Sequence, residues 1–257
     1  MASHSLLLCF DDELAIARQV ADAAGIELAV IERHHFPDGE LKLRLPERLS
    51  GSVTLLRSLD RPNEKLVELL LSAQTARQLG AARLTLIAPY LAYMRQDMAF
   101  RPGEAVSQTI VGRFLASLFD ALITVDPHLH RVATLEQAVP VPQAVVLSGA
   151  PLLADLIARH HASPLLMGPD GESAQWVAQA AQRHGFDHAV CHKVRDGDRQ
   201  VSIALPDVAL QGRAVVLIDD VASTGRTVAQ AARLALQAGA ASVDVAVTHA
   251  LFAGDAL

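Results

Sequence analysis

The sequence has little of what characterises secreted, fibrous or membrane-spanning proteins. Its only cysteines, Cys9 and Cys191, lie in apolar or mixed runs, so we expect buried free thiols and no disulfide framework. No apolar run reaches the length of a membrane-spanning helix, and the apolar stretch that ends at Phe10 is too short, and lacks the basic leader, for a signal peptide. These absences predict a soluble, cytoplasmic chain without a membrane partner.

Positive charge is also scarce, because 22 Lys and Arg residues face 28 Asp and Glu residues, for a formal net charge of -6. This balance disfavours nucleic acid as a partner, since binding it requires broad neutralisation of phosphates, but it leaves room for a local basic pocket that holds small phosphates. Aromatic residues make up only 4% of the chain and apolar residues 51%, which is typical of helices and strands packed in layers. We therefore expect a folded protein with a small-molecule partner.

Short apolar runs alternate with amphipathic stretches along the whole chain. The apolar runs predict strands at residues 6–10, 52–59, 84–89, 122–126, 144–147, 165–168, 188–192 and 215–220. The amphipathic stretches predict helices at residues 13–24, 64–79, 106–119, 151–160, 172–184 and 227–238. This order predicts an α/β fold with mainly parallel sheets flanked by helices. The prolines at 140 and 142 indicate a linker between two domains, residues 1–142 and 143–257.

The most informative segment begins with the apolar run at 215–218, which ends in Asp219 and Asp220. A turn of small residues follows and opens a helix, so its backbone N–H groups are expected to converge on a phosphate dianion. The two acids would be poor phosphate ligands but good acceptors for sugar hydroxyls or for water around a cation. The alternative is an ordinary helix N-cap at Ser223 or Thr224. The unbroken order of strand, acid pair and Thr-Gly-x-Thr turn favours the phosphate site.

This segment resembles the motif that binds phosphoribosyl diphosphate (PRPP) in phosphoribosyltransferases and PRPP synthases. It departs from many members at Ser223, where they have a third acid, and at Arg226, where they have a second glycine. The resemblance implies a ribose 5-phosphate site made of Asp219, Asp220, Ser223, Thr224, Gly225, Arg226 and Thr227.

Further motifs distinguish an enzyme that makes PRPP from one that consumes it. They lie at residues 36–40, 89–97 with 102–104, 125–128, 169–170 and 193–195. Their order and approximate spacing resemble the ribose-phosphate diphosphokinase (PRPP synthase) family over nearly the whole chain, and Ser223 with the compact Lys-x-Arg segment is similar to its shorter, archaeal-type branch. The resemblance implies two phosphoribosyltransferase-like domains.

The resemblance also implies an ATP site. Its predicted residues are Phe36, Asp38, Glu40, Arg95, Gln96 and Asp97. Phe36 precedes a Pro-Asp-Gly turn and could stack on a purine; the alternative is an ordinary turn beside a core phenylalanine. In the family this loop contacts adenine across a subunit interface, which implies a homo-oligomer. For Arg95 and its neighbours the alternative is a solvated loop, and Met98 and Ala99 replace basic residues found in many members.

The remaining predictions concern metal binding and catalysis. His128 and Asp170 each follow an expected strand, and by resemblance they share a Mg²⁺ ion that bridges ATP phosphates. His130 departs from the common family form and is not assigned a role. Lys193 and Arg195 alternate on one face of an extended segment and, with His128, are the predicted catalytic residues that clamp the polyphosphate. Two solvated charges on a hairpin are the alternative for this pair.

The resemblance therefore implies Mg²⁺-dependent transfer of the β,γ-diphosphoryl group of ATP to the C1 hydroxyl of ribose 5-phosphate, giving PRPP and AMP. Two other functions remain open at this point. A phosphoribosyltransferase that consumes PRPP would share the loop at 219–227, and a catalytically silent regulatory homologue would bind nucleotide without turnover. Family members continue for a further strand and helix beyond the equivalent of Leu257, so we also expect a naturally short or truncated chain.

Overall fold

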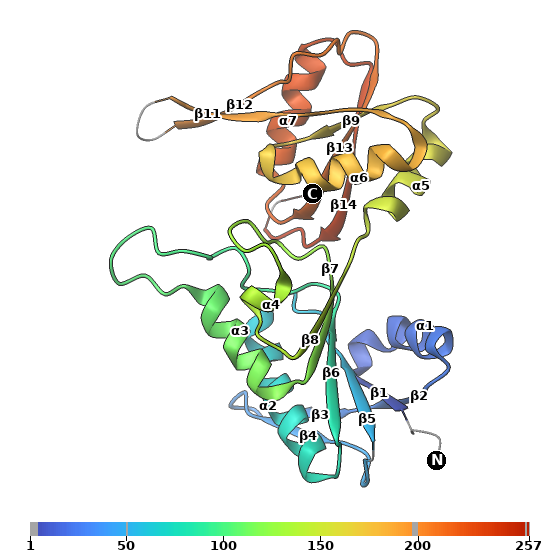
Figure 1. The fold of residues 1–257 in the computed structure, drawn as a ribbon, viewed down its shortest axis with the longest axis vertical. Coiled ribbons are helices and arrows are strands. Elements are labelled where there is room, and N and C mark those ends of the chain that lie inside the picture. The colour runs from blue at the N-terminus through green and yellow to red at the C-terminus, as the bar shows by residue number, and fades with distance from the viewer. Residues whose placement is uncertain (1–4, 50, 197–199, 255, 257) are drawn as a thin grey trace. The chain divides into compact units, whose positions relative to one another are not determined.

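The computed structural model describes residues 5–49, 51–196, 200–254 and 256, and it describes no side chains from Lys193 to Ser202. The chain divides into two compact units, Met1–Leu147 and Ser148–Leu257 (Figure 1). Each unit is an α/β structure built on its own parallel sheet. The predicted fold class is confirmed.

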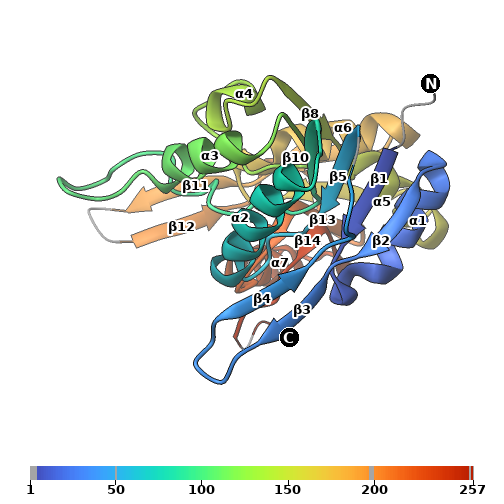
Figure 2. The ribbon, with the colours of Figure 1, turned by 90° about the horizontal axis from the view of Figure 1, so that it is seen from below.

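The first unit has a six-stranded sheet in the order β2-β1-β5-β6-β7-β8. Its strands are β1 (Ser5–Cys9), β2 (Glu27–Val30), β5 (Ser52–Leu56), β6 (Arg83–Ala88), β7 (Ala121–Val125) and β8 (Gln143–Leu147). Its helices are the short 3-10 helix η1 (Asp11–Glu13), α1 (Leu14–Ala24), α2 (Pro62–Gln78), α3 (Ser107–Leu118) and α4 (Leu135–Ala138). An antiparallel hairpin, β3 (Glu32–His35) and β4 (Leu41–Arg44), lies beside α2 (Figure 2).

The central strands of this sheet contribute side chains to clusters on both faces, because successive residues of a strand point to opposite sides. Leu8 and Leu55 join the larger core cluster with Leu69 of α2 and Leu115 of α3. Their chain neighbours pack on the other face, in a smaller cluster that contains Leu7, Leu56, Ala17 and Ala21, the last two from α1. This double coverage explains why the strands read as nearly continuous apolar runs in the sequence.

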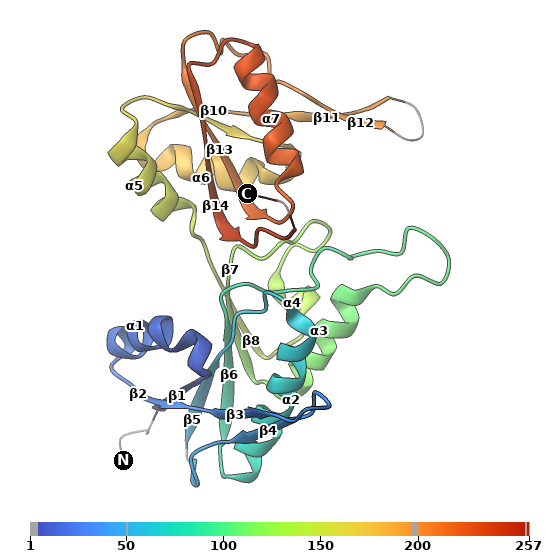
Figure 3. The same cartoon turned by 180° about the vertical axis from the view of Figure 1, so that it is seen from behind.

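The second unit has a four-stranded parallel sheet in the order β10-β9-β13-β14. Its strands are β9 (Leu165–Gly168), β10 (Asp187–Val190), β13 (Ala214–Ala222) and β14 (Ser242–Ala250), with a separate antiparallel pair, β11 (His192–Asp196) and β12 (Gln200–Ala204). Its helices are α5 (Ala150–His160), η2 (Gly171–Ser173), α6 (Ala174–His184) and α7 (Arg226–Gln237). Helices α5 and α6 pack on one face of the sheet and α7 on the other (Figure 3).

The two units meet five residues later along the chain than the sequence predicted. Residues 143–147, placed in the second domain at 143–257, form β8 and pair with β7 of the first sheet, from Ala121↔Gln143 to Val125↔Leu147. The segment expected to be a linker instead belongs to the first unit, where Ala138, Val139 and Val141 are buried in the core.

None of the helices in the described part of the chain is both long and apolar enough to span a membrane.

Candidate active site

The predicted phosphate loop lies between β13 and α7 in the second unit. Strand β13 ends at Ala222, and α7 begins at Arg226 with Gly225 as its N-cap residue. Gly225 has φ 68°, a left-handed conformation that glycine adopts without the steric cost of a Cβ atom. Because the first N–H groups of a helix lack intrahelical partners, the start of this 12-residue helix offers donors to an anion. Thr224, Arg226 and Thr227 are exposed there.

The predicted sugar-binding acids lie at the carboxyl end of β13. Strand β13 pairs in parallel with β9, so Asp170, which follows β9, belongs to the same edge of the sheet. Asp220 and Asp170 are buried, at 2% and 7% exposure, and Asp219 is partly buried. Burial, the charge of Asp220 and the charge of Asp170 raise the pKa of Asp219 to about 8. These carboxyl groups form a cluster that a cation or sugar hydroxyls would stabilise.

Asp170 also has a local structural role. Its carboxylate accepts a hydrogen bond from the N–H of Glu172 at 2.9 Å and so caps η2. His128, its predicted partner at a metal ion, belongs to the other unit, and each unit is described by itself. The shared metal site therefore remains a prediction.

The predicted adenine loop forms the turn of the β3–β4 hairpin. The N–H of Phe36 donates to the carbonyl of Glu40 at 2.8 Å, and the N–H of Glu40 donates to the carboxylate of Asp38 at 3.2 Å. Gly39 has φ 93°, which lets the turn close. Phe36 is 40% exposed and contacts His34 edge to face, with 4.9 Å between ring centroids. An exposed ring at the tip of a hairpin is not the core phenylalanine of the alternative interpretation.

Two side-chain contacts hold this hairpin against α2. His35 Nε2 lies 2.5 Å from Glu64 Oε1, and the guanidinium of Arg33 contacts the carboxylate of Glu68. Arg33 and His35 are two residues apart on a strand and so share a face. Glu64 and Glu68 are four residues apart on a helix and also share a face, which lets the two contacts form side by side. The sequence analysis did not find this pattern, although both spacings are visible in the sequence.

Glu68 continues into a buried network at the carboxyl end of β5. Its side chain is 0% exposed and accepts a hydrogen bond at 2.7 Å from Arg57, whose side chain is 1% exposed. Arg57 also reaches Asp12 at 2.8 Å, and its guanidinium carbon lies 4.6 Å from the centre of the Phe10 ring. Burial opposes the charge of Asp12, but its bond to Arg57 lowers the pKa of Asp12 below the usual range.

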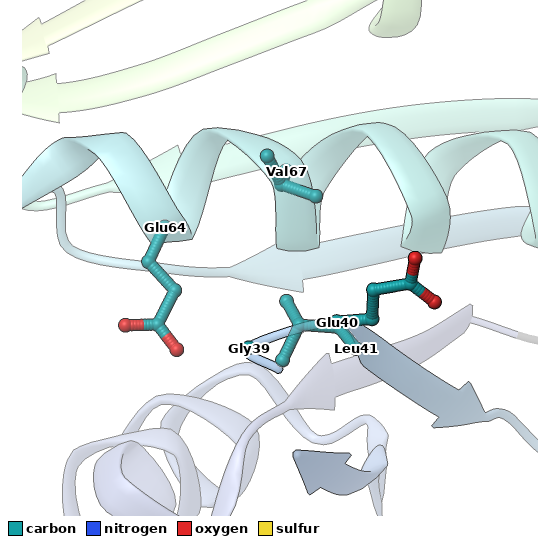
Figure 4. Close-up of a pocket in the computed structure, with 5 residues that line it drawn as sticks. All are labelled: Gly39, Glu40, Leu41, Glu64 and Val67. Atoms are coloured by element: carbon teal, nitrogen blue, oxygen red, sulfur yellow. The ribbon is translucent and has the colours of Figure 1, made fainter. Parts of the chain in front are cut away.

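A cavity of about 420 Å³ lies between the hairpin turn and α2. It is lined by Gly39, Glu40, Leu41, Glu64 and Val67 (Figure 4). Glu40, a predicted ATP-binding residue, thus faces a cavity whose opposite wall carries Glu64, the partner of His35.

The Arg95–Asp97 segment follows β6. Arg95 is exposed, as a phosphate- or base-binding residue requires, and the side-chain amide of Gln96 donates to the carbonyl of Met98 at 2.9 Å. The side chain of Asp97 is only 2% exposed and accepts two hydrogen bonds from Arg131, at 2.7 and 2.9 Å. This burial suits an anchor for the loop that carries Arg131 better than a direct contact with nucleotide. The sequence analysis did not identify Arg131, because nothing in the sequence around it indicates that it pairs with Asp97.

His128 follows β7 in the same loop as Arg131. Its ring lies against that of His130, with 3.9 Å between centroids and 82° between planes, and their Nε2 atoms are in contact. The sequence had assigned no role to His130.

Lys193 and Arg195 lie on β11, opposite Ile203 and Val201 of β12. Their alternation along a strand is as predicted, but their side chains lie outside the described part of the chain, so the clamp remains a prediction.

Comparisons with known proteins identify the class of the fold. Residues 148–254 match the phosphoribosyl transferase domain family, and residues 6–118 match the N-terminal domain of ribose phosphate pyrophosphokinase. A solved structure, phosphoribosylpyrophosphate synthetase from Mycobacterium smegmatis, is 25% identical and superposes with a TM-score of 0.85, covering 98% of this chain and 83% of that chain. The protein thus consists of two phosphoribosyltransferase-type units.

Archaeal relatives narrow the class to one family. The chain is 36% identical over 253 residues to the ribose-phosphate pyrophosphokinase of Methanopyrus kandleri, covering 98% of this chain and 86% of that protein. It is 35% identical over 235 residues to the ribose-phosphate pyrophosphokinase of Sulfolobus acidocaldarius, covering 89% and 79%. The chain belongs to the ribose-phosphate pyrophosphokinase family of enzymes, as its motifs predicted.

Proposed function

We propose that this enzyme transfers the β,γ-diphosphoryl group of ATP to the C1 hydroxyl of ribose 5-phosphate, giving PRPP and AMP. The observation that carries the proposal is the open start of α7 directly after the carboxyl cluster of β13. Helix N–H groups suit the 5-phosphate, and Asp219 and Asp220 suit the ribose hydroxyls. Membership of the family supports the same substrates.

ATP is proposed to bind in the first unit. The exposed ring of Phe36, with Asp38 and Glu40 on the same turn, offers a stacking surface and polar contacts for adenine, and Arg95 offers a guanidinium to the phosphates. Because Phe36 projects from the hairpin tip, we propose that it contacts adenine bound to a second copy of the chain, in a homo-oligomer.

Magnesium is the proposed cation of the reaction. Asp170, Asp219 and Asp220 offer carboxylate oxygens, the donors that Mg²⁺ prefers, and the raised pKa of Asp219 is consistent with a cluster that lacks sufficient compensating positive charge. Bound there, Mg²⁺ would neutralise charge on the diphosphoryl group. His128, the second ligand expected from the family, offers a nitrogen donor instead.

The chemistry requires no enzyme nucleophile. The C1 oxygen forms a bond to the β-phosphorus, the bond from the β-phosphorus to the bridging oxygen of the α-phosphate breaks, and AMP leaves with that oxygen. The hydroxyl proton passes to solvent. Catalysis of this kind depends on in-line positioning and on charge stabilisation, which we assign to Lys193, Arg195 and Arg95.

The test is an assay with ATP, ribose 5-phosphate and Mg²⁺ in which AMP and PRPP are followed together by phosphorus NMR. We expect equal amounts of both products, and none without ribose 5-phosphate. Binding of both substrates without turnover would instead indicate the regulatory homologue, and consumption of added PRPP with a base would indicate a phosphoribosyltransferase.

A paired variant tests the proposed clamp. Lys193→Ala with Arg195→Ala should lower turnover by about a hundredfold or more, since these cations are proposed to act on the diphosphoryl group. Ribose 5-phosphate binding, measured by calorimetry, should change little. The matched control is Lys42→Ala, which removes one exposed cation from the other unit's hairpin. Unchanged turnover in the double variant would remove both residues from the mechanism.

A further inference from the structure

The segment that follows β14 is hydrogen-bonded to the proposed phosphate loop. Strands β13 and β14 pair with each other up to their last residues, and both chains then continue past the end of the sheet. The N–H groups of Leu251 and Phe252 both donate to the carbonyl of Ala222, at 3.0 and 3.2 Å. The N–H of Ala253 donates to the carbonyl of Ser223 at 2.9 Å. Successive N–H groups of the segment thus bind successive carbonyls of the loop.

The backbone of this segment is strained at its middle residue. Phe252 has φ 40°, a left-handed conformation that is uncommon for a residue with a bulky side chain. Its ring is 40% exposed, so burial of the ring does not account for the strain. Such strain persists where surrounding contacts impose it. Here those contacts are the hydrogen bonds to Ala222 and Ser223, which the chain reaches one after the other by turning at Phe252.

The same hydrogen bonds fix the direction of two N–H groups in the loop. In a planar trans peptide unit, the C=O of one residue and the N–H of the next point in opposite directions. The carbonyl of Ala222 shares its unit with the N–H of Ser223, and the carbonyl of Ser223 shares its unit with the N–H of Thr224. Both N–H groups therefore point away from residues 251–253. No hydrogen bond found in the described part of the chain uses either of them as a donor.

We propose that residues 251–253 are positioning residues, which hold the N–H groups of Ser223 and Thr224 in the direction that binds the 5-phosphate of the substrate. Successive N–H groups that face one way form an anion-binding concavity, and these two add to the open N–H groups at the start of α7. Donors that are already aligned bind an anion without the entropy loss of aligning them. The inference rests on the proposed function for the identity of the anion, and it adds residues that lie outside the loop motif.

The experiment removes one hydrogen bond of the segment and leaves every side chain unchanged. Ala253 is replaced by its α-hydroxy acid analogue, so that an ester oxygen takes the place of the N–H that donates to Ser223. Calorimetry without ATP should show the dissociation constant for ribose 5-phosphate rising about fivefold, the usual effect of one neutral hydrogen bond. The KM for ribose 5-phosphate should rise by the same factor. The kcat and the KM for ATP should not change, because the 5-phosphate does not react and its contacts hold substrate and transition state equally.

Two controls separate positioning from general damage. The matched control places the same analogue at Ala241, whose N–H donates to the carbonyl of Arg213 at 2.8 Å in the same unit but outside the loop. Its dissociation constant for ribose 5-phosphate should equal that of the wild type. Ala253→Ser retains the N–H at an exposed position, so it should also bind ribose 5-phosphate as the wild type does.

Wild-type affinity in the Ala253 analogue, or an equal loss in the Ala241 analogue, would overturn the positioning role. A matching rise in the KM for ATP would overturn it too, since the segment would then support the fold in general. A wild type that does not bind ribose 5-phosphate at all would reject both the positioning role and the phosphate site. The expected loss of binding in a protein that forms no PRPP would support the positioning role and reject the proposed reaction alone.

Discussion

The two units differ in the charges that surround their buried ionisable side chains. In the first unit Arg57 and Glu68 are almost completely buried, and each contacts opposite charges within 3 Å. In the second unit burial, together with the negative charges of Asp220 and Asp170, raises the pKa of Asp219 to about 8. Opposite charges hold the hairpin and the start of α1 in place without a ligand. At the end of β13, ionising the buried Asp219 beside two other acids remains costly until a ligand compensates the negative charge.

This difference is what we expect between a structural cluster and the cluster that we propose binds substrate. A site for a cation or for polyhydroxylated substrate needs acceptors that the protein itself has not already satisfied, and such acceptors reduce the stability of the empty protein. An ion-pair network instead needs charged groups that other groups of the protein already satisfy. If the comparison is right, substitutions in the network of Arg57 and Glu68 should lower stability. Substitutions in the carboxyl cluster of Asp219 and Asp220 should lower activity while raising stability.

The largest expected effect is a loss of stability when the network of Arg57 and Glu68 is broken. Glu68→Ala leaves Arg57 and Arg33 without a shared buried carboxylate, and we expect the free energy of unfolding to fall by about 3–5 kcal/mol in urea denaturation. Glu32→Gln is the control, because Glu32 pairs with Arg44 on the exposed side of the same hairpin and should leave the unfolding curve unchanged. Equal behaviour of the two variants would mean that the buried network is as dispensable as a surface pair.

The next effect concerns activity. Asp219→Asn with Asp220→Asn removes the proposed acceptors of the ribose hydroxyls and should lower kcat/KM for ribose 5-phosphate by about a hundredfold or more, because buried polar groups of the substrate would lose their partners. The same variant should unfold at higher urea concentration than the wild type. A variant that is both inactive and less stable would place these acids with the structural cluster.

The pH dependence of stability sharpens the comparison further. The pKa of Asp219 rises from 3.8 to about 8 on folding, so between these values the folded chain binds the proton more tightly than the unfolded chain does. Stability from this group is fully present below pH 3.8 and is lost as pH rises through about 8. The difference in unfolding free energy between wild type and Asp219→Asn should therefore move against the wild type as pH rises, and a pH-independent difference would contradict the raised pKa.

The contrast also explains what could be predicted from sequence. Most strands of the two sheets were predictable because burial on two faces produces apolar runs, although β2 was not predicted. The loop after Asp220 was predictable because its residues are contiguous in the chain. Strand β3 consists of charged residues and histidines, and β4 alternates leucines with exposed cations, so neither strand forms an apolar run. Strand β14 was overlooked although Val243, Val245 and Val247 alternate with other residues along it.

Contacts between distant residues could not be predicted in the same way. Arg57 and Glu68 are separated by 11 positions, and Asp97 and Arg131 by 34, so their pairing depends on which strands become neighbours. The role of Asp97 illustrates the limit. Its position in a motif predicts a contact with ATP, which stays a prediction, but nothing in that motif indicates its ion pair with Arg131.

The smallest expected effect concerns the exposed contact between His35 of the hairpin and Glu64 of α2. His35 and Glu64 are 47% and 60% exposed, so their pair should contribute less than about 1 kcal/mol to stability. Glu64→Gln keeps the shape of the side chain but removes its charge, and we expect the hairpin turn to be held less firmly over α2. If Phe36 on that turn contacts adenine, the KM for ATP should rise by up to about fivefold while kcat and the KM for ribose 5-phosphate stay near wild type. Glu64→Asp, which keeps the negative charge on a shorter side chain, should bring the KM for ATP part of the way back to the wild-type value. A matching rise in both KM values would instead indicate a general loss of structure, because only a local change in the hairpin affects one substrate alone.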